Sequence, residues 1–239
     1  SQTGASATVT LNITKTSDTS AVTIPKYTSF TTTSDGITYT FQTLQEYVSS
    51  TVTSASPSRT ITNVSITEGK KYTHQWVANT NDVEQKFIIP NVGVDTSTLV
   101  VKVKDNPGSG TSTLYTQYSN IESLTSTSNT YFLQESYDKK YEIYFGDDVF
   151  GKSIQDGNVI DVEYLTTNGE IANKLGNDDS STSRSFTAVA PTDISGVSAI
   201  EVVVNSVASG GANIQTISNI KFNAPKWFQT QGRAVTADD

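Results

Sequence analysis

Apolar and polar residues alternate in the first part of the chain with the period of a β-strand. From Ala7 to Ile13 every second residue is apolar, and the residues between are Thr or Asn, which is typical of a strand with one buried face. A second alternation surrounds the pair Asp35-Gly36, and Asp-Gly supplies the positive φ values that a tight hairpin needs. The pattern therefore predicts a strand followed by a hairpin.

Similar short runs continue to residue 205. They cover residues 60–78 with Glu68-Gly69 as a break, and then 84–91, 97–104, 131–136, 140–145, 158–165, 186–191 and 199–205. Helical spacing is weak and limited to residues 44–50 and 210–222. About a dozen strands against one to three short helices predict a mostly-β protein. A change of pattern near residues 79–82 predicts a boundary between two β-rich domains.

Composition narrows the possible partners. The 239 residues carry 16 basic and 24 acidic side chains, for a net charge of -8, so the surface disfavours nucleic acid and anionic lipid. There is no cysteine, which excludes disulfides and thiolate chemistry. No apolar run approaches the roughly 20 residues of a membrane span. Because the chain begins at Ser1 and lacks methionine, we expect a fragment or a processed piece.

One acidic stretch is the main candidate for chemistry. In residues 141–169, Gly146 and Gly151 enclose Asp147 and Asp148, and the predicted strands on both sides place them on a hairpin-like connection. Glycoside cleavage needs two carboxylates on opposite walls of a cleft, roughly 5 to 9 Å apart, whereas neighbours on one turn usually diverge. We therefore interpret this stretch as a structural turn whose acids cap their own backbone.

Two other site types remain to be weighed. Asp147, Asp148, Asp156 and Asn158 could supply oxygen ligands to calcium, but their spacing departs from the EF-hand loop. His74 is the single histidine, which excludes multi-histidine zinc sites, and we interpret it as a strand residue beside Trp76. The sequence predicts no catalytic, cofactor-binding or metal site, and no small-molecule substrate.

Three stretches resemble one family. Residues 141–169 are similar to F-G-D-x-x-F/L-G-x-x-L-x-x-G-N-x-I-x-V-x-Y-L-x-T-N-G, residues 219–239 to an aromatic segment followed by R-A-V-T and an acidic pair, and residues 22–32 to V-x-I-P-x-G-T-x-F. These patterns belong to baseplate wedge proteins of contractile-tailed (myovirus) bacteriophages, in the baseplate J-like family. Lys26-Tyr27 stands where that family usually has Ala-Gly, Asp148 where it often has glycine, and Gln215 where it often has glutamate.

The resemblance implies an arrangement of domains. A family segment with paired glycines is matched by Asn205, Gly210 and Gly211, and in simpler members it follows the first strands directly. Residues 1–80 with 175–222 would then form a discontinuous outer β-domain, residues 81–174 an inserted β-domain, and residues 223–239 the start of a truncated C-terminal region. The early strands would pair with residues 186–205.

The resemblance also implies a function without catalysis. We expect a structural subunit of a phage tail baseplate wedge, which joins other wedge subunits and a second copy of itself around the central hub and rearranges when the sheath contracts. It would be assembled in the bacterial host cytoplasm and reside in the virion. Trp227, Phe228 and Arg233 are residue types enriched at interfaces, so we expect a subunit contact there. The alternative is a carbohydrate-binding or adhesin β-module.

Overall fold

The structure confirms a mostly-β protein. The computed structural model describes residues 1–15, 19–52, 58–118, 124–136, 138–176, 185–189 and 196–214. Within this part the strands form a six-stranded, a seven-stranded and a two-stranded sheet, and a 3-10 turn, η2 (Gly169–Ala172), accompanies them. No helix of the described ranges has the length and apolar character of a membrane span. The predicted contact residues Trp227, Phe228 and Arg233 lie outside the described residues, as do Gln215 and residues 223–239.

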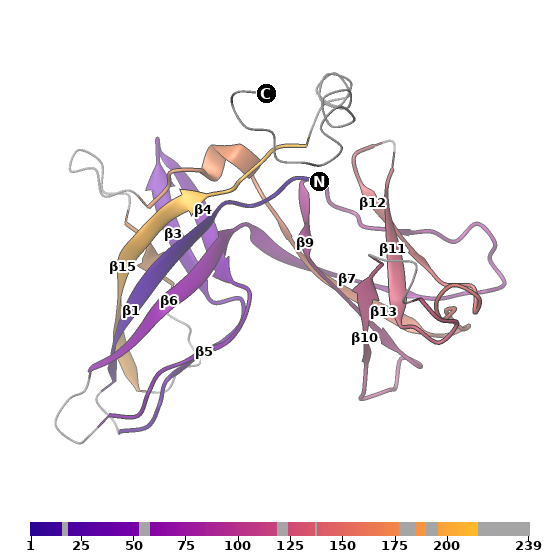
Figure 1. Cartoon of the computed structure of the whole chain (residues 1–239), viewed down its shortest axis with the longest axis horizontal. Coiled ribbons are helices and arrows are strands. Elements are labelled where there is room, and N and C mark those ends of the chain that lie inside the picture. The colour runs from indigo at the N-terminus through magenta and orange to yellow at the C-terminus, as the bar shows by residue number, and fades with distance from the viewer. Residues whose placement is uncertain are drawn as a thin grey trace, which may run out of the picture.

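The first sheet joins strands from both ends of the described chain (Figure 1). Its order is β14 (Thr187–Ala188), β3 (Ser29–Ser34), β4 (Ile37–Thr43), β6 (Ser58–Glu68), β1 (Ser6–Lys15) and β15 (Val197–Ser209). Strand β1 pairs antiparallel with β15 along its length and with β6 on its other side. It therefore lies between one strand that follows soon after it in sequence and one near the end of the described chain.

The alternation in the sequence matches the burial of the first sheet. Every second residue of β1 is buried, including Val9, Leu11 and Ile13 at 0% exposure. The predicted hairpin is confirmed: β3 and β4 pair antiparallel on either side of Asp35 and Gly36, whose φ values are 52° and 77°.

The helix predicted for residues 44–50 is wrong. Here β5 (Tyr47–Val48) pairs with β2 (Thr23–Ile24) in a small separate sheet. The Ser49 amide donates to the Val22 carbonyl, and the Val22 amide donates to the Ser49 hydroxyl. Three apolar residues at helical spacing are a weak signal, and tertiary pairing with residues 22–24 overrides it. The second weak helical pattern, residues 210–222, lies mostly outside the described residues.

The second sheet is built from the middle of the chain. Its order is β7 (Lys70–Val77), β13 (Val159–Thr166), β9 (Val94–Lys104), β10 (Thr113–Gln117), β11 (Thr130–Glu135), β12 (Tyr141–Phe145) and β8 (Phe87–Ile88). β12 and β13 are not neighbours, so the predicted hairpin-like connection between them is wrong. β13 pairs instead with β7 and β9, because the alternation of apolar residues in each strand does not determine which strand lies beside it.

The chain changes sheets at two places that lie close together. Gly69 separates β6 from β7, and the chain leaves the second sheet after Thr166. A Cβ atom on Gly69 would lie 2.8 Å from the Thr166 carbonyl oxygen. β7 thus pairs in the second sheet although it precedes the domain boundary placed near residue 80. The assignment of the sheets to an outer and an inserted domain stays a prediction.

Each sheet has its own hydrophobic core. The first core includes Phe30 and Phe41, and Phe186 adds a ring from late in the chain, 4.7 Å from Phe41 between centroids. The second core is rich in tyrosine, valine and isoleucine, with Trp76 and Phe87 packed against it. The two cores divide the described chain into two separately packed units that meet at the crossing strands.

Candidate functional site

The acidic turn follows β12 and closes on itself. Asp147 Oδ1 accepts hydrogen bonds from the amides of Val149, at 3.0 Å, and Phe150, at 2.8 Å. This is the usual way in which an aspartate stabilises a turn two residues ahead of it. The Asp147 side chain is therefore directed at its own main chain.

Asp148 is engaged with the end of the same loop. Its Oδ1 accepts from the Ser153 amide at 2.8 Å, and its Oδ2 accepts from the Ser153 hydroxyl at 2.6 Å. The Asp148 amide donates to the Gly151 carbonyl at 2.9 Å. Asp148 has a φ of 64°, a left-handed conformation that aspartate tolerates better than most residues.

The two glycines of the turn allow the backbone to approach itself. A Cβ atom on Gly146 would lie 2.1 Å from the Gly151 carbonyl oxygen, and Gly151 has a φ of 87°. Side chains at these positions would force the loop open. The turn thus depends on Gly146 and Gly151 as well as on the two acids.

Hydrogen bonding shifts both carboxyl groups toward the ionised form. The amides of Phe150 and Val149 lower the pKa of Asp147, and the hydroxyl and amide of Ser153 lower the pKa of Asp148. A general acid that works near neutral pH needs a raised pKa. Neither carboxyl is suited to that role, and the prediction of a non-catalytic chain stays a prediction.

The possible calcium ligands are divided among different contacts. Asp156 Oδ1 accepts from the Thr80 amide, while Asn158 bonds the Gln155 amide and the Asp105 carbonyl. Within the ranges that the structure describes, no three His, Cys, Asp or Glu side chains gather as a metal site would require. The arrangement uses these oxygens to tie neighbouring loops.

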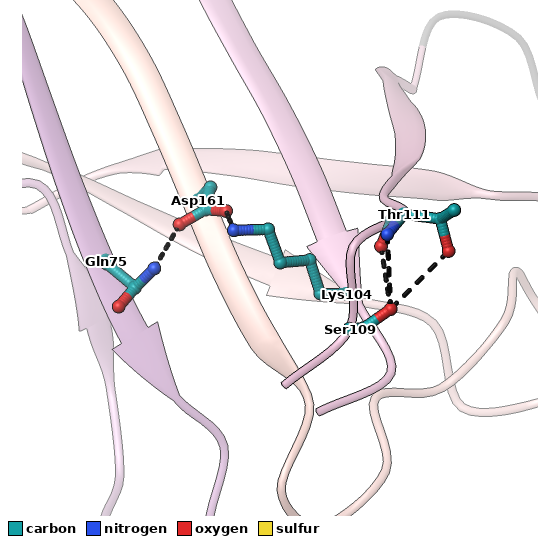
Figure 2. A network of polar contacts seen from close by, with 5 residues as sticks. All are labelled: Gln75, Lys104, Ser109, Thr111 and Asp161. Atoms are coloured by element: carbon teal, nitrogen blue, oxygen red, sulfur yellow. Dashed lines mark hydrogen bonds and ion pairs between the residues drawn. The ribbon is translucent and has the colours of Figure 1, made fainter. Parts of the chain in front are cut away.

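His74 lies on the same face of β7 as Trp76, opposite the buried Val162 of β13. Its ring meets Trp76 edge-to-face at 4.6 Å between centroids, and it lines a polar groove of about 540 Å³ together with residues of β9 and β13. Asp161 lines this groove, and its carboxylate accepts a hydrogen bond from Gln75 and pairs with Lys104 Nζ at 2.7 Å (Figure 2). Burial raises the pKa of Asp161, but the bonds from Lys104 and Gln75 outweigh it and lower the pKa overall.

A second polar site lies where the chain passes between the two sheets, and the sequence did not predict it. Glu68 is 1% exposed, and its carboxylate accepts from the Thr167 hydroxyl at 2.7 Å, the Asn168 amide at 3.0 Å and the Asn168 side-chain nitrogen at 2.7 Å. Glu68 ends β6, whereas Thr167 and Asn168 follow β13. One buried charge thus ties together the two crossings of the chain.

Asp95 makes a comparable tie from β9. Its side chain is buried, and Oδ2 accepts from the Gly4 amide at 2.8 Å while Oδ1 accepts from the Ser97 amide and hydroxyl. Gly4 lies just before β1, in the first sheet. Glu68 and Asp95 carry only a weak signal in the sequence. Glu68-Gly69, for example, is also the pattern of an ordinary turn.

Tyr27 provides a third tie. Its hydroxyl donates to Glu163 Oε2 on β13 at 3.0 Å, and Lys71 Nζ lies 4.2 Å from the centre of its ring. Burial and the charge of Glu163 raise the pKa of Tyr27. These contacts, together with Glu68 and Asp95, form what we call the joint: Gly4, Tyr27, Glu68, Asp95, Glu163, Thr167 and Asn168.

Comparisons with known proteins add no identification. No protein-family model matches the sequence, and no curated protein does. The joint and the acidic turn therefore define the candidate site by geometry alone, as a structural site in a two-sheet β protein.

We expect the joint to depend on the charge of Glu68. In Glu68→Gln, an amide nitrogen replaces one oxygen and faces donors, so unfolding free energy should fall by about 2–4 kcal/mol. Urea denaturation would measure the loss. Glu46→Gln, at an exposed position of the first sheet's unit, is the matched control and should change stability little. Equal stability of wild type and Glu68→Gln would contradict the role of the joint.

We expect the acidic turn to make stability depend on pH. Because the folded pKa values of Asp147 and Asp148 lie below the unfolded value of about 3.9, their contribution is present above that value and is lost as pH falls through the folded pKa values. The stability difference between wild type and the double variant Asp147→Asn, Asp148→Asn should therefore be largest near neutral pH and shrink in acid. A difference that does not vary with pH would rule out this capping role.

Proposed function

We propose that the chain is a structural subunit of a phage tail baseplate wedge. In this role it assembles with other wedge subunits and with a second copy of itself around the central hub, and it changes position when the sheath contracts. It is made in the bacterial host cytoplasm and becomes part of the virion. Its function is to hold neighbouring proteins in place, with no cofactor, nucleic acid or membrane as partner.

The observation that carries the proposal is backbone geometry at two motif positions. In the described part of the chain, the non-glycine residues with positive φ are Tyr27, Asp35, Asn63, Lys139, Asp148 and Lys174. Tyr27, at 67°, stands where the resembling entry-strand motif has glycine, and Asp148, at 64°, stands at a variable motif position that the family often fills with glycine. A glycine is the residue most suited to that conformation. This agreement supports the resemblance independently of the side chains that suggested it.

The joint suits a protein that transmits a change of position. Buried hydrogen bonds that Glu68 accepts from Thr167, and Asp95 from Gly4, fix the two sheets to each other at the crossing. A flexible linker would let one sheet move without the other. Two rigidly tied sheets instead transmit a displacement from a protein bound to one sheet to a protein bound to the other.

The carbohydrate-binding or adhesin reading remains the second candidate. Such a module needs an exposed aromatic platform with polar groups around it. Trp76 has rings of His74 and Phe87 packed against it, which argues against its use as a platform. Tyr144 is 40% exposed beside a pocket, and this is the observation that favours the alternative.

The left-handed backbone at Tyr27 gives a test of the motif comparison. Tyr27→Gly and Tyr27→Ala lose the same ring contacts, but only glycine relieves the strain, so the glycine variant should be more stable by about 1 kcal/mol. Thr38 is an exposed residue of β4. Here Thr38→Ala should be more stable than Thr38→Gly. Thermal or urea unfolding of the four variants would measure both differences. An alanine variant at position 27 as stable as the glycine variant would contradict the comparison.

Assembly itself can be tested by co-expression. The chain would be produced with each tail structural protein encoded near its own gene, and light scattering after size exclusion would give the composition of any complex. We expect a complex of fixed stoichiometry with at least one of them, retained at high salt. A chain that stays monomeric with all of them, and instead binds an oligosaccharide, would favour the alternative function.

A further inference from the structure

A pocket of about 280 Å³ opens where β8 stops pairing with β12. β8 pairs only with Glu142 and Ile143 of β12. Before β8 the chain turns away, with the Gln85 amide bonded to the Asp82 carbonyl and the Asp82 amide to the Asn79 carbonyl. Within the described residues, the rest of β12 therefore has no strand beside it on this edge.

The floor of the pocket is apolar and firmly packed. Phe87 and Phe145 line it, and their rings meet edge-to-face at 5.8 Å between centroids. Ile143 is 1% exposed, and Ile154 packs against the same core. Aromatic and aliphatic walls of this kind suit one apolar side chain.

The rim of the pocket is mainly acidic. Asp82 and Glu142 line it, Lys86 is the one lysine among its described lining residues, and the acidic turn adjoins it through Gly146 and Ser153. Glu142 is 8% exposed and lines the pocket. The hydrogen bonds that Asp147 and Asp148 accept within the turn lower the pKa values of both carboxyl groups, which are ionised near neutral pH.

Exposed apolar residues occur on the pocket wall and on the turn that adjoins it. Tyr144 is 40% exposed, Phe150 54% and Val149 63%. The amides of Val149 and Phe150 are both held by Asp147, so these side chains stand on a fixed turn. Apolar residues that remain exposed beside a pocket often mark a protein-binding surface.

We propose that this pocket and the adjoining acidic turn bind an extended peptide segment of another protein, in which one aromatic or large aliphatic side chain is flanked by basic residues. The apolar side chain fills the pocket, the basic residues face the acidic rim, and the peptide runs beside the unpaired part of β12, as in recognition by strand addition.

Charge favours this occupant over a second copy of the chain. A second copy would bring another acidic rim and the same net charge of -8, and like charges at an interface are unfavourable. A basic partner gains attraction from the same groups. The inference stands apart from the proposed baseplate role, since it concerns a different surface from the joint. It competes with the carbohydrate-binding alternative, which would use the same pocket beside Tyr144.

The first test uses a defined probe, the peptide acetyl-Arg-Lys-Phe-Lys-Arg-amide, titrated into the ¹⁵N-labelled chain. We expect amide shift changes concentrated in residues 79–87 and 142–154. Replacing the peptide's Phe by Ala should weaken binding by about ten-fold or more, and exchanging its basic residues for Glu should abolish binding. Raising the salt concentration should weaken binding.

A pair of matched variants tests the rim. Lys86→Glu removes the lysine at the rim and should tighten binding of the same peptide by about three-fold. Lys174→Glu makes the same change of charge at an exposed residue outside the second sheet and should leave binding unchanged. Urea unfolding of both variants would establish that each is folded.

Three results would overturn the proposal. The first is equal binding of the Phe and Ala peptides, which would show attraction by charge alone. The second is shift changes scattered over both sheets. The third is occupation of the pocket by a neutral oligosaccharide such as chitohexaose in place of the peptide. Failure of the peptide would leave the assembly test unaffected, because that test follows complex formation by the whole chain.

Discussion

The buried carboxylate of Glu68 is the interaction on which the arrangement of the two sheets depends. A charge taken out of water is costly unless hydrogen bonds replace its hydration. Here three donors from Thr167 and Asn168 do so. Because these donors lie just after β13, where the chain leaves the second sheet, the cost of burying Glu68 is offset only when both crossings of the chain are in place.

The joint also determines how the rest of the molecule is presented. β1, β14 and β15 belong to the first sheet, whereas the acidic turn and the apolar pocket belong to the unit built around the second sheet. Their orientation relative to the first sheet is set by Glu68 and by Asp95, which holds the Gly4 amide. The acidic turn and the pocket therefore keep a fixed orientation relative to the first sheet.

Much of the fold could be predicted from the sequence, because the period of two in β1 and the Asp35-Gly36 pair are local signals. The order of strands in the second sheet could not, since nothing local to β12 and β13 records that they have different neighbours. The helix expected at residues 44–50 failed for a related reason. Three apolar residues at helical spacing say nothing about the strand at residues 23–24 that pairs with them.

The residues of the candidate site also differ in whether a local sequence pattern could predict their role. The self-capping of Asp147 and Asp148 could be inferred from adjacent acids between glycines, which is a short-range pattern. The role of Glu68 could not, because its partners are about a hundred residues away in sequence. The pocket is equally hidden, since its walls come from residues 78–87 and 142–154, and only the folded chain brings them together.

The passage from β6 to β7 has a mechanical consequence. Gly69 alone separates these strands of 11 and 8 residues, and in Figure 1 the chain runs from β6 of the first sheet into β7 of the second. In the first sheet β6 lies between β4 and β1, and in the second β7 pairs with β13. Tension along β6 and β7 loads many backbone hydrogen bonds in shear at the same time. The two strands therefore resist extension far better than a strand whose hydrogen bonds are peeled apart one after another.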